Sequence, residues 1–310
     1  MQKIKNPLVS IIMNCHNGEK YLLEALQSVL NQTYKKWEII FWDNNSSDNS
    51  SDIIRNNNDP RIKYYFSEEY TKLGHARNLA LEKTNGELIA FLDCDDLWLP
   101  NKLEMQVPVF DDLEVGISIS NSIFFNNKGK KKLLYKARPK EGFVFKELLE
   151  GYYISMETVV IRKSSLELLD EYFDERFEVI EEFDLFIRLS KYCKLVYVDQ
   201  ILGKWRVHQS SWTWRRKDLF PKETRLFVEK ITKIIPETKT IYKYNIEKLK
   251  HNIICQEFLI AWETNNFYDK RNDLKKIIFK SNKALILYLL SFLINYKIFD
   301  YINSKRLIKE

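Results

Sequence analysis

The chain has 310 residues, of which 45% are hydrophobic and 30% are charged, and its formal net charge is +6. This is a globular composition with room for one large domain or one and a half, and it is too weakly basic to indicate nucleic-acid binding. The four cysteines are far apart and form no CxxC pair, which argues against a zinc site or a disulfide framework. No segment resembles a signal peptide or reaches the roughly 20 apolar residues of a membrane-spanning helix, so we expect a cytoplasmic protein, free or peripheral on the cytoplasmic face of the membrane.

Apolar runs alternate with amphipathic helical patterns through the first third of the chain. We expect strands at 8–13, 37–42, 61–66 and 87–92, and helices between them at 19–32, 50–57 and 74–84. Alternation with short connections predicts a mostly parallel sheet with right-handed crossovers.

The remainder of the chain is less regular. We expect a helix near 101–109, an antiparallel hairpin formed by 115–125 and 131–135, a strand at 156–162, a helix at 180–192, and short strands at 195–198 and 204–207. From residue 219 onward the pattern is helical.

The run from Glu87 to Asp96 is the most informative segment of the chain. Five apolar residues after Glu87 predict a strand buried on both faces, and Asp93, Asp95 and Asp96 follow at its carboxyl end. Carboxylates this close repel one another, so a fold that groups them usually offsets them with a cation or a ligand. The carboxyl ends of strands are where open α/β sheets bind ligands, and hard oxygen ligands suit Mg²⁺ or Mn²⁺. The alternative is an acidic loop that caps the helix starting near Pro100.

Other polar residues are expected at the same edge of the sheet. The first strand runs into the loop 14–18, and the second strand ends at Asp43, which is well placed for a nucleotide base or a ribose hydroxyl. Asn, Ser and Asp residues also turn chains and cap helices without binding anything. Arg77 lies in the first turn of a helix, where the helix dipole disfavours a cation, and this makes sense if its guanidinium grips a diphosphate. The alternative for Arg77 is a surface salt bridge.

These segments together resemble glycosyltransferase family 2, a group of inverting enzymes with the A-type glycosyltransferase fold, here of the bacterial cell-surface glycan type. The resemblance covers about two-thirds of the chain, from Pro7 to Ser211, and is carried by PLVSIIMNCHNGEKYLLEALQSVLNQTY, WEIIFWDNNSSDNS, KLGHARNLALEKTNGELIAFLDCDD, FDERFEVIEEFDLFIRLS and KWRVHQSS. It implies an α/β protein whose nucleotide-binding, mostly parallel sheet is flanked by helices, with a C-terminal helical extension. We expect a catalytic domain at 1–215, with a nucleotide-sugar half at about 1–112 and an acceptor half at about 113–215, followed by a helical region at 216–310.

The resemblance implies roles for residues at the donor site. It places Asp43 at the nucleotide base, Asp93 near the ribose, Asp95 on a divalent cation (Mg²⁺ or Mn²⁺) and Arg77 near the diphosphate, with His16 where the family usually has a tyrosine that packs on the base. The donor-binding residues expected on this basis are Asn14, His16, Asn17, Glu19, Asp43, Arg77, Asp93 and Cys94.

The resemblance also places the catalytic base on the helix at 180–192. The family's Glu-Asp motif maps onto Glu181-Glu182, with Glu182 as the base, and its Arg-x-His motif maps onto Arg206 and His208, where His208 completes the metal or diphosphate site. Helix geometry favours Glu182, because Glu181 is turned about 100° and Asp184 about 200° away from its face. Acids at a helix start also stabilise the helix without any catalytic role. Further contacts are expected from Asn78, Asp96, Glu181, Arg206 and Trp212.

The expected activity is a metal-assisted, inverting transfer of a sugar from a nucleotide-sugar, with a UDP-sugar as the expected donor, to a hydroxyl of a glycan or lipid-linked glycan acceptor (hexosyltransferase-like, EC 2.4). Two alternatives stay open at this point. A nucleotidyltransferase that makes nucleotide-sugars should show a glycine-rich N-terminal loop, which NCHNGEK does not supply. A non-catalytic glycan-binding module would tolerate the loss of Asp95 or Glu182, and the chain keeps both.

The segment 284–294 is apolar around most of a helix and is flanked by Lys283 and Lys297. It is too short to span a bilayer. It is expected either to be buried against the catalytic domain or to rest on an anionic membrane surface, to which Lys275, Lys276 and Lys280 add attraction.

Overall fold

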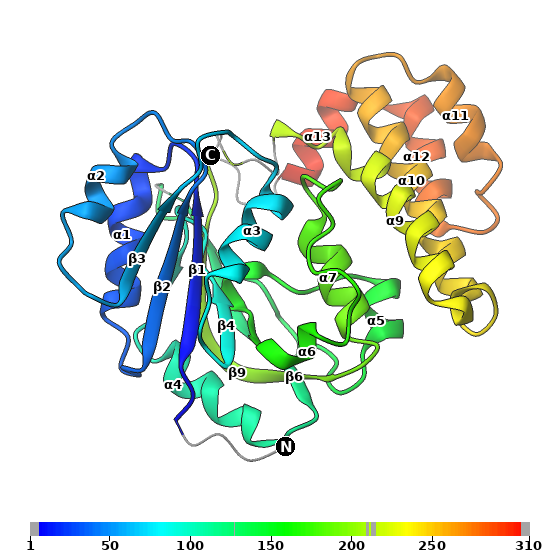
Figure 1. Ribbon diagram of the computed structural model, residues 1–310. Coiled ribbons are helices and arrows are strands. Elements are labelled where there is room, and N and C mark those ends of the chain that lie inside the picture. Colours follow the sequence, from blue (N-terminus) through cyan, green and yellow to red (C-terminus); the bar gives the residue numbers. More distant parts are fainter. Residues whose placement is uncertain (1–5, 127, 209–210, 212–214, 305–310) are drawn as a thin grey trace. The chain divides into compact units, whose positions relative to one another are not determined.

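The computed structural model describes residues 6–126, 128–208, 211 and 215–304 (Figure 1). The chain divides into two compact units. The first comprises Met1–Phe145 and Tyr152–Val207, and the second comprises Lys146–Gly151 and His208–Glu310.

The first unit is built on a mixed sheet that has nine strands within the described residues, in the order β3-β2-β1-β4-β8-β6-β9-β5, with β7 paired to β6. Its parallel half consists of β1 (Val9–Cys15), β2 (Trp37–Asp43), β3 (Ile62–Phe66) and β4 (Leu88–Phe91). The other strands are β5 (Leu97–Trp98), β6 (Val115–Phe125), β7 (Lys131–Leu133), β8 (Val160–Arg162) and β9 (Lys194–Arg206). The expected hairpin is confirmed, because β6 and β7 pair antiparallel.

Helices cover both faces of the parallel half. Figure 1 shows α1 (Glu19–Leu30) and α2 (Ser50–Arg55) on one side, and α3 (Leu73–Glu82) and α7 (Glu181–Leu189) on the other. The shorter helical segments of the first unit are α4 (Lys102–Gln106), α6 (Lys163–Leu166), and the 3₁₀ helices η1 (Val107–Asp111) and η2 (Met156–Thr158), while α5 (Phe145–Glu150) begins at the boundary between the units. Because helices cover both faces of the sheet, β1 and β2 are nearly continuous runs of apolar residues. The sequence therefore predicts these two strands well.

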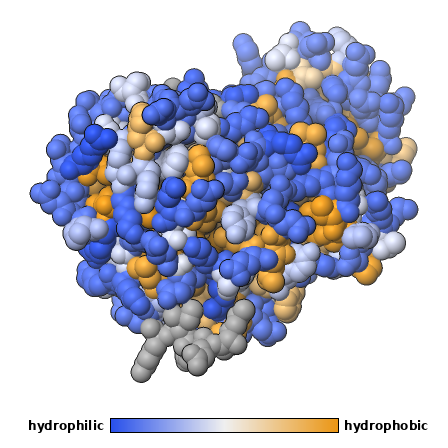
Figure 2. Space-filling model, viewed as in Figure 1, coloured by the Kyte–Doolittle hydropathy of each residue, from blue (hydrophilic) through white to orange (hydrophobic). Residues whose placement is uncertain are grey.

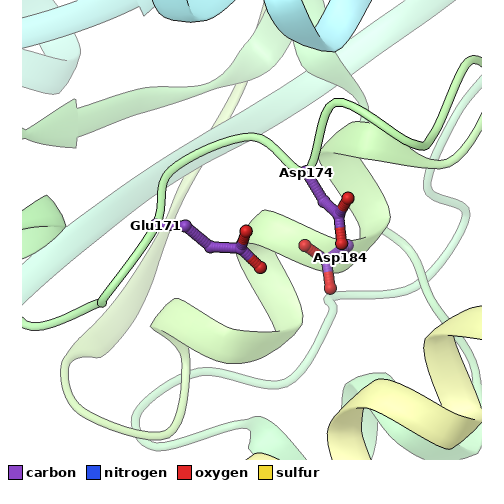
Figure 3. A group of neighbouring side chains, drawn as sticks. All are labelled: Glu171, Asp174 and Asp184. Carbon is purple, nitrogen blue, oxygen red and sulfur yellow. The ribbon is translucent and has the colours of Figure 1, made fainter.

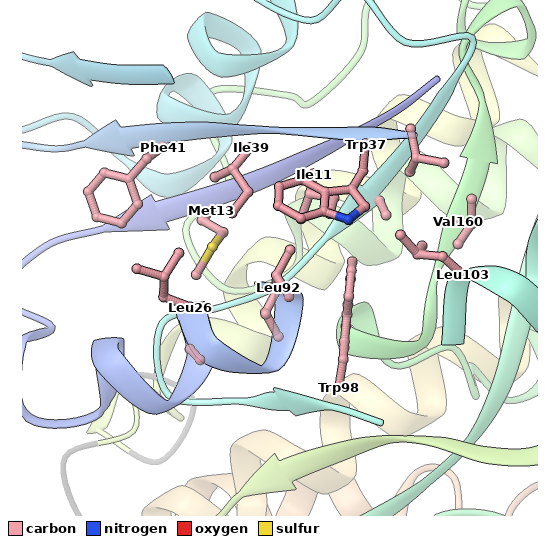
Figure 4. Close-up of a cluster of buried hydrophobic side chains, with 14 of the residues drawn as sticks. Ile11, Met13, Leu26, Trp37, Ile39, Phe41, Leu92, Trp98, Leu103 and Val160 are labelled. Atoms are coloured by element: carbon pink, nitrogen blue, oxygen red, sulfur yellow. The ribbon is translucent and has the colours of Figure 1, made fainter. Parts of the chain in front are cut away.

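One core lies between the sheet and α1. Figure 4 shows Ile11 and Met13 of β1 and Ile39 and Phe41 of β2 pointing to the same side, toward Leu26 of α1. Alternate residues of the same strands face α3 on the opposite side, as the two-residue period of a strand requires. This double packing fixes the strand ends from which the polar loops emerge.

Two expectations about strands were wrong in detail. The pattern at 195–198 and 204–207 belongs to a single strand, β9, which stays paired with β6 across register shifts near Asn121. The segment 156–162 is a strand only in its second half, because Met156–Thr158 forms a 3₁₀ turn. The short strand β5 was not expected. It pairs antiparallel with β9 at Lys204 and Gly203 and so brings the loop after β4 next to the end of β9.

The second unit is helical. After α5 it contains α9 (Leu219–Ile234), η3 (Pro236–Lys239), α10 (Lys243–Glu263), α11 (Tyr268–Lys275), α12 (Asn282–Leu293) and α13 (Tyr296–Ser304). Its core gathers Phe258 and Trp262 of α10, Leu274 of α11, and Ala284 and Leu287 of α12. Among the described residues, none of the helices combines the length and the apolar character required to cross a membrane. The face seen in Figure 2 is mainly hydrophilic, with hydrophobic patches between the polar side chains.

Candidate active site

The loops that follow β1 and β2 interlock at the carboxyl edge of the sheet. Asn17 has a positive φ of 57°, a conformation that asparagine tolerates, and its backbone amide donates to Ser46 Oγ at 3.0 Å. Its side-chain oxygen accepts from the amide of Ser47 at 2.8 Å. Glu19 Oε2 accepts from the backbone and side-chain nitrogens of Asn49. Asn17 and Glu19, two of the residues that the sequence assigned to donor binding, therefore join the loop after β1 to the loop after β2.

Asp43 organises this edge from within. Its side chain is fully buried, with Oδ1 accepting from the amide of Ser46 and Oδ2 from the hydroxyl of Tyr64, both at 2.8 Å. Burial, together with this bond to Asp43, raises the pKa of Tyr64 to about 12. The carboxylate thus has a clear structural role, and its predicted contact with a nucleotide base stays a prediction.

An aromatic pair lies beside Asp43 on the exposed side. The His16 and Tyr70 ring centroids are 4.6 Å apart in a tilted arrangement, and His16 Nδ1 hydrogen-bonds the carbonyl oxygen of Asn44 at 3.0 Å. The ring of His16 is thereby held in one orientation at the rim. A flat, fixed ring at this position could stack on a base.

The acidic loop after β4 alternates in exposure. Asp93 and Asp95 are partly exposed, whereas Cys94 and Asp96 are buried. Burial raises the pKa of Asp93, an effect opposed by Arg77 and reinforced by Asp95. Burial and the neighbouring carboxylates, Asp95 first among them, raise the pKa of Asp96 well above its ordinary value. The loop therefore concentrates negative charge that favours either protonation or a cation.

Arg206, at the end of β9, holds this loop in place. Its backbone amide donates to Asp96 Oδ1, and its Nε donates to the backbone carbonyl of Asp95, both at 2.8 Å. Its Nη2 also donates to Glu24 at 2.8 Å, and the guanidinium lies over the rings of Tyr21 and Phe125. Arg206 is thus a positioning residue that fixes the backbone from which Asp95 projects.

Arg77 connects the acidic loop to α7. Its side chain is 3% exposed and forms a short ion pair with Glu181, while Nη2 donates to Asp93 Oδ1 at 3.2 Å. The guanidinium therefore already meets two carboxylates, and its predicted grip on a diphosphate stays a prediction. The alternative of a surface salt bridge is wrong, because the pair with Glu181 is buried.

Close packing between α3 and the segment before α7 makes this pair feasible. A Cβ atom on Gly74 would lie 3.1 Å from the carbonyl oxygen of Asp174 and 3.4 Å from Cβ of Glu181. Asn78 exchanges two hydrogen bonds with the backbone of Phe173, at 2.9 and 3.0 Å. Asn78, expected as a further ligand contact, is thus occupied in joining the two segments.

The three acids at the start of α7 have different surroundings. Glu181 pairs with Arg77, and Asp184 pairs with Arg188 at 2.7 Å within the helix. Glu182 is half-buried, and no hydrogen bond joins its carboxylate to any residue that the structure describes. Burial raises the pKa of Glu182 to about 8, an effect opposed by Arg77 and reinforced by the charges of Glu181, Asp93 and Glu157. Of the three, Glu182 alone forms no ion pair with an arginine among the described residues.

Comparison with known proteins identifies the family. The family model described as "Glycosyl transferase family 2" matches residues 10–180. The chain belongs to glycosyltransferase family 2. It is therefore an enzyme of the glycosyltransferase class, which overturns the alternatives of a nucleotidyltransferase and of a non-catalytic module.

Individual relatives of this glycosyltransferase support the family assignment. It is 32% identical over 206 residues to Escherichia coli WfgD, a UDP-Glc:alpha-D-GlcNAc-diphosphoundecaprenol beta-1,3-glucosyltransferase, covering 66% of this chain and 79% of the relative. It is also 32% identical to Bacillus subtilis TuaG, a putative teichuronic acid biosynthesis glycosyltransferase, over 50% of this chain and 62% of the relative.

Solved structures share the A-type fold with this glycosyltransferase. Staphylococcus aureus TarS 1–349 in complex with UDP-GlcNAc has a TM-score of 0.59 at 17% identity, covering 90% of this chain and 89% of the other. Against a longer TarS chain the coverage is 39% of that chain. The mannosyltransferase PcManGT from Pyrobaculum calidifontis, in complex with GDP-Man and Mn²⁺, has a TM-score of 0.57 at 18% identity, covering 98% of this chain and 88% of the other.

Two buried residues that act electrostatically on the predicted site residues were not predicted from the sequence. Glu157 is buried, its carboxylate accepts from the Ser155 hydroxyl, and it acts electrostatically on both Asp96 and Glu182. Tyr152 packs its ring 5.0 Å from that of Phe183, and its pKa is raised by burial and by Glu182. A charged residue inside the apolar run 154–161 was the available signal for Glu157, whereas nothing local distinguishes Tyr152.

A separate group of acids lies on the other side of α7. Oxygen atoms of Glu171, Asp174 and Asp184 lie within 4.8 Å of one another (Figure 3). Two arginines offset the negative charge of this group, because Arg188 pairs with Asp184, and Arg176 pairs with Asp174 at 2.6 Å. It contains none of the residues that the sequence assigned to the metal.

The remaining predicted residues have distinct positions. Cys94 is buried and donates from Sγ to the carbonyl oxygen of Asn14 at 3.1 Å, which links the acidic loop to the end of β1. His208 is buried in the second unit, and its role at a cation stays a prediction. Trp212 lies outside the described residues.

Proposed function

We propose that the protein is an inverting glycosyltransferase that moves a sugar from a nucleotide-sugar, with UDP as the expected nucleotide, to a hydroxyl of a glycan or lipid-linked glycan in cell-surface polysaccharide synthesis. The name of WfgD, which states a UDP-sugar donor and a lipid-linked acceptor, supports this assignment. The TarS complex with UDP-GlcNAc supports the same class of donor. Residues up to about 215 form the catalytic part in this proposal.

The main support for the proposal is that Glu182 has a raised pKa and no arginine partner among the described residues. A general base must be free to accept a proton, and its pKa should lie near the working pH. Glu182 meets both conditions, whereas arginines neutralise Glu181 and Asp184. In the proposed step the acceptor oxygen bonds to the anomeric carbon, the bond from that carbon to the diphosphate oxygen breaks, and the acceptor proton passes to the Glu182 carboxylate. A single displacement of this kind inverts the anomeric configuration.

The acidic loop fits a divalent cation. Burial and mutual repulsion raise the pKa values of Asp93 and Asp96, so a positive ion beside them would relieve a repulsion that is present in the protein alone. Carboxylate oxygens are the ligands that Mg²⁺ and Mn²⁺ prefer. Asp95 would hold the ion, with its backbone fixed by Arg206. When bound, such an ion stabilises the negative charge on the departing diphosphate.

Paired glutamine variants test the proposal. Glu182→Gln keeps the shape of the side chain and removes the base, so it should retain UDP binding and lose roughly 10²–10⁴-fold in turnover. Glu181→Gln is the matched control on the same helix and should lose far less. The assay is release of free nucleotide from a panel of UDP-, GDP- and dTDP-sugars in Mn²⁺. Near wild-type turnover in Glu182→Gln, with an inactive Glu181→Gln or Asp184→Asn, would show that the base is misassigned.

A further inference from the structure

The helix α12 has an outward face made almost entirely of large apolar side chains. Leu285, Ile286, Leu289, Phe292 and Leu293 are between 38% and 76% exposed. They fall on one side of the helix, while Ala284 and Leu287 on the other side pack into the core of the second unit. Scattered exposed hydrophobic residues are ordinary, but five on one face of a single helix mark an interaction surface.

The neighbouring elements extend this surface. Phe279, in the turn before α12, is 98% exposed, and Ile298, Tyr301 and Ile302 of α13 are also exposed. Phe292 and Leu293 form part of the wall of a pocket of about 350 Å³ that is also lined by Trp262, Phe267 and Tyr296. The apolar surface therefore continues to the edge of a pocket whose walls are partly aromatic and partly polar, with Asn265, Ser291 and Asn295 among them.

The charge around the surface indicates what covers it. The segment from Phe267 to Ser304 carries seven basic and three acidic residues. The exposed lysines of this segment are Lys275, Lys276, Lys280, Lys283 and Lys297. Lys276 pairs with Asp273 at 2.8 Å, and the segment keeps a net positive charge. An apolar face on a cationic segment is complementary to a bilayer of anionic lipid, where acyl chains take the apolar residues and headgroups take the lysines. A second copy of the chain would bring the same positive charge and would be repelled.

We propose that the outward face of α12 docks the enzyme on the surface of an anionic membrane. A helix of 12 residues is about 18 Å long, so it lies in the plane of the interface and does not cross it. The long side chains of Lys280, just before the helix, and Lys283, in its first turn, reach the headgroups while the apolar face enters the acyl boundary. The docking surface is inferred from the exposure and charge of its residues and does not depend on the proposed function. Docking would bring the enzyme to the membrane, where it would meet the lipid-linked acceptor of the proposed function.

Vesicle binding by the full chain tests the docking surface. The wild-type protein should sediment with vesicles of phosphatidylglycerol and phosphatidylcholine, and less with phosphatidylcholine alone or at high salt. The double variant Leu289→Ser with Leu293→Ser should bind about tenfold more weakly or worse, because two of the inserting side chains are lost. Ile241→Ser, which changes an equally exposed residue outside this face, is the matched control and should bind like the wild type. Lys280→Glu with Lys283→Glu should weaken binding to the anionic vesicles only.

Two further measurements keep the outcomes distinct. Circular dichroism and thermal melting should show both double variants folded, as expected for exposed positions. Hydrolysis of UDP-glucose in the absence of vesicles should be the same in the variants and the wild type, so that failure of the catalytic proposal does not mask or mimic failure of docking. Wild-type protein that stays entirely in the supernatant, or a dimer seen by light scattering that Leu289→Ser with Leu293→Ser abolishes, would overturn the membrane assignment.

Discussion

Arg77 of α3 and Glu181 of α7 form a buried ion pair, although 104 residues separate them in the chain. The two side chains are 3% and 5% exposed, and the second guanidinium nitrogen of Arg77 reaches Asp93 in the acidic loop. One cation therefore connects the proposed metal-binding loop to the helix that carries the proposed base. Glu182 follows Glu181 in the chain, and the charges of Arg77 and Glu181 both act on its pKa.

Removing Arg77 alone should destabilise the fold. Arg77→Ala takes the guanidinium away from a buried carboxylate, and breaking such a pair typically costs about 3–5 kcal/mol. Chemical denaturation should show a loss of that size in the free energy of unfolding. Lys250→Ala removes a lysine that is 49% exposed and paired with Glu247, itself 46% exposed, so as a control it should cost about 1 kcal/mol or less.

Removing both partners separates structure from donor binding. Arg77→Met with Glu181→Met replaces a buried pair by apolar side chains of similar volume, and its stability should return close to that of the wild type. If Arg77 also grips the diphosphate, this folded double variant should bind UDP at least about tenfold more weakly by calorimetry. Unchanged UDP affinity would limit Arg77 to its structural role.

The pH dependence of turnover should report Glu182. A general base acts in its ionised form, so kcat/KM should be at its plateau above the pKa of Glu182, about 8, and should fall about tenfold for each pH unit below it. The negative charge of Glu181 raises this pKa, so Glu181→Gln should move the profile to lower pH. Profiles measured at saturating Mn²⁺ check this, and a profile that Glu181→Gln leaves in place would contradict the electrostatic link.

Much of this arrangement could be predicted from the sequence, because its signals are local. The strand before Asp93 is an uninterrupted apolar run, and the helical period puts Leu185, Phe186 and Leu189 on the buried side of α7 with Glu182 at the edge. Both are properties of a few consecutive residues.

The rest depends on contacts between distant segments. The two residues of β5 carry no periodicity, yet their pairing with β9 brings Arg206 to the acidic loop. Arg77 is badly placed for the helix dipole, and its partners Glu181 and Asp93, which lie on other elements, compensate for that position. Glu157 falls within the segment predicted as a strand at 156–162, and it is instead a buried acid in a 3₁₀ turn within electrostatic range of Glu182.

Asp95 should govern both metal binding and the stability of the metal-free protein. Its charge raises the pKa values of Asp93 and Asp96, so Asp95→Asn relieves repulsion and should raise the melting temperature without metal. The same change removes a hard oxygen ligand, so Mn²⁺ should no longer increase UDP affinity. Calorimetry with UDP, with and without Mn²⁺, is the measurement. Full metal-dependent UDP affinity in Asp95→Asn would refute the assignment.

Lys102 provides a test that is read out by stability and does not require turnover. Its side chain is fully buried, its Nζ donates to the carbonyl oxygen of Thr158 at 2.9 Å, and burial lowers its pKa to about 7. Between that pH and the ordinary lysine pKa the unfolded chain holds a proton that the folded chain has lost. The contribution of Lys102 to stability therefore rises with pH across this window, by up to about 1.4 kcal/mol per unit.

Lys102→Met should remove this dependence. Methionine fills the space of the aliphatic stem without a buried amine, and Thr158 keeps a second donor in Gln106 Nε2 at 2.9 Å. The variant should therefore be more stable than the wild type at pH 7, and its advantage should shrink as the pH rises. Urea denaturation of both proteins at several pH values between neutral and moderately alkaline measures the difference. A gap between the two unfolding free energies that does not change with pH would mean that the folded protein keeps Lys102 charged despite its burial.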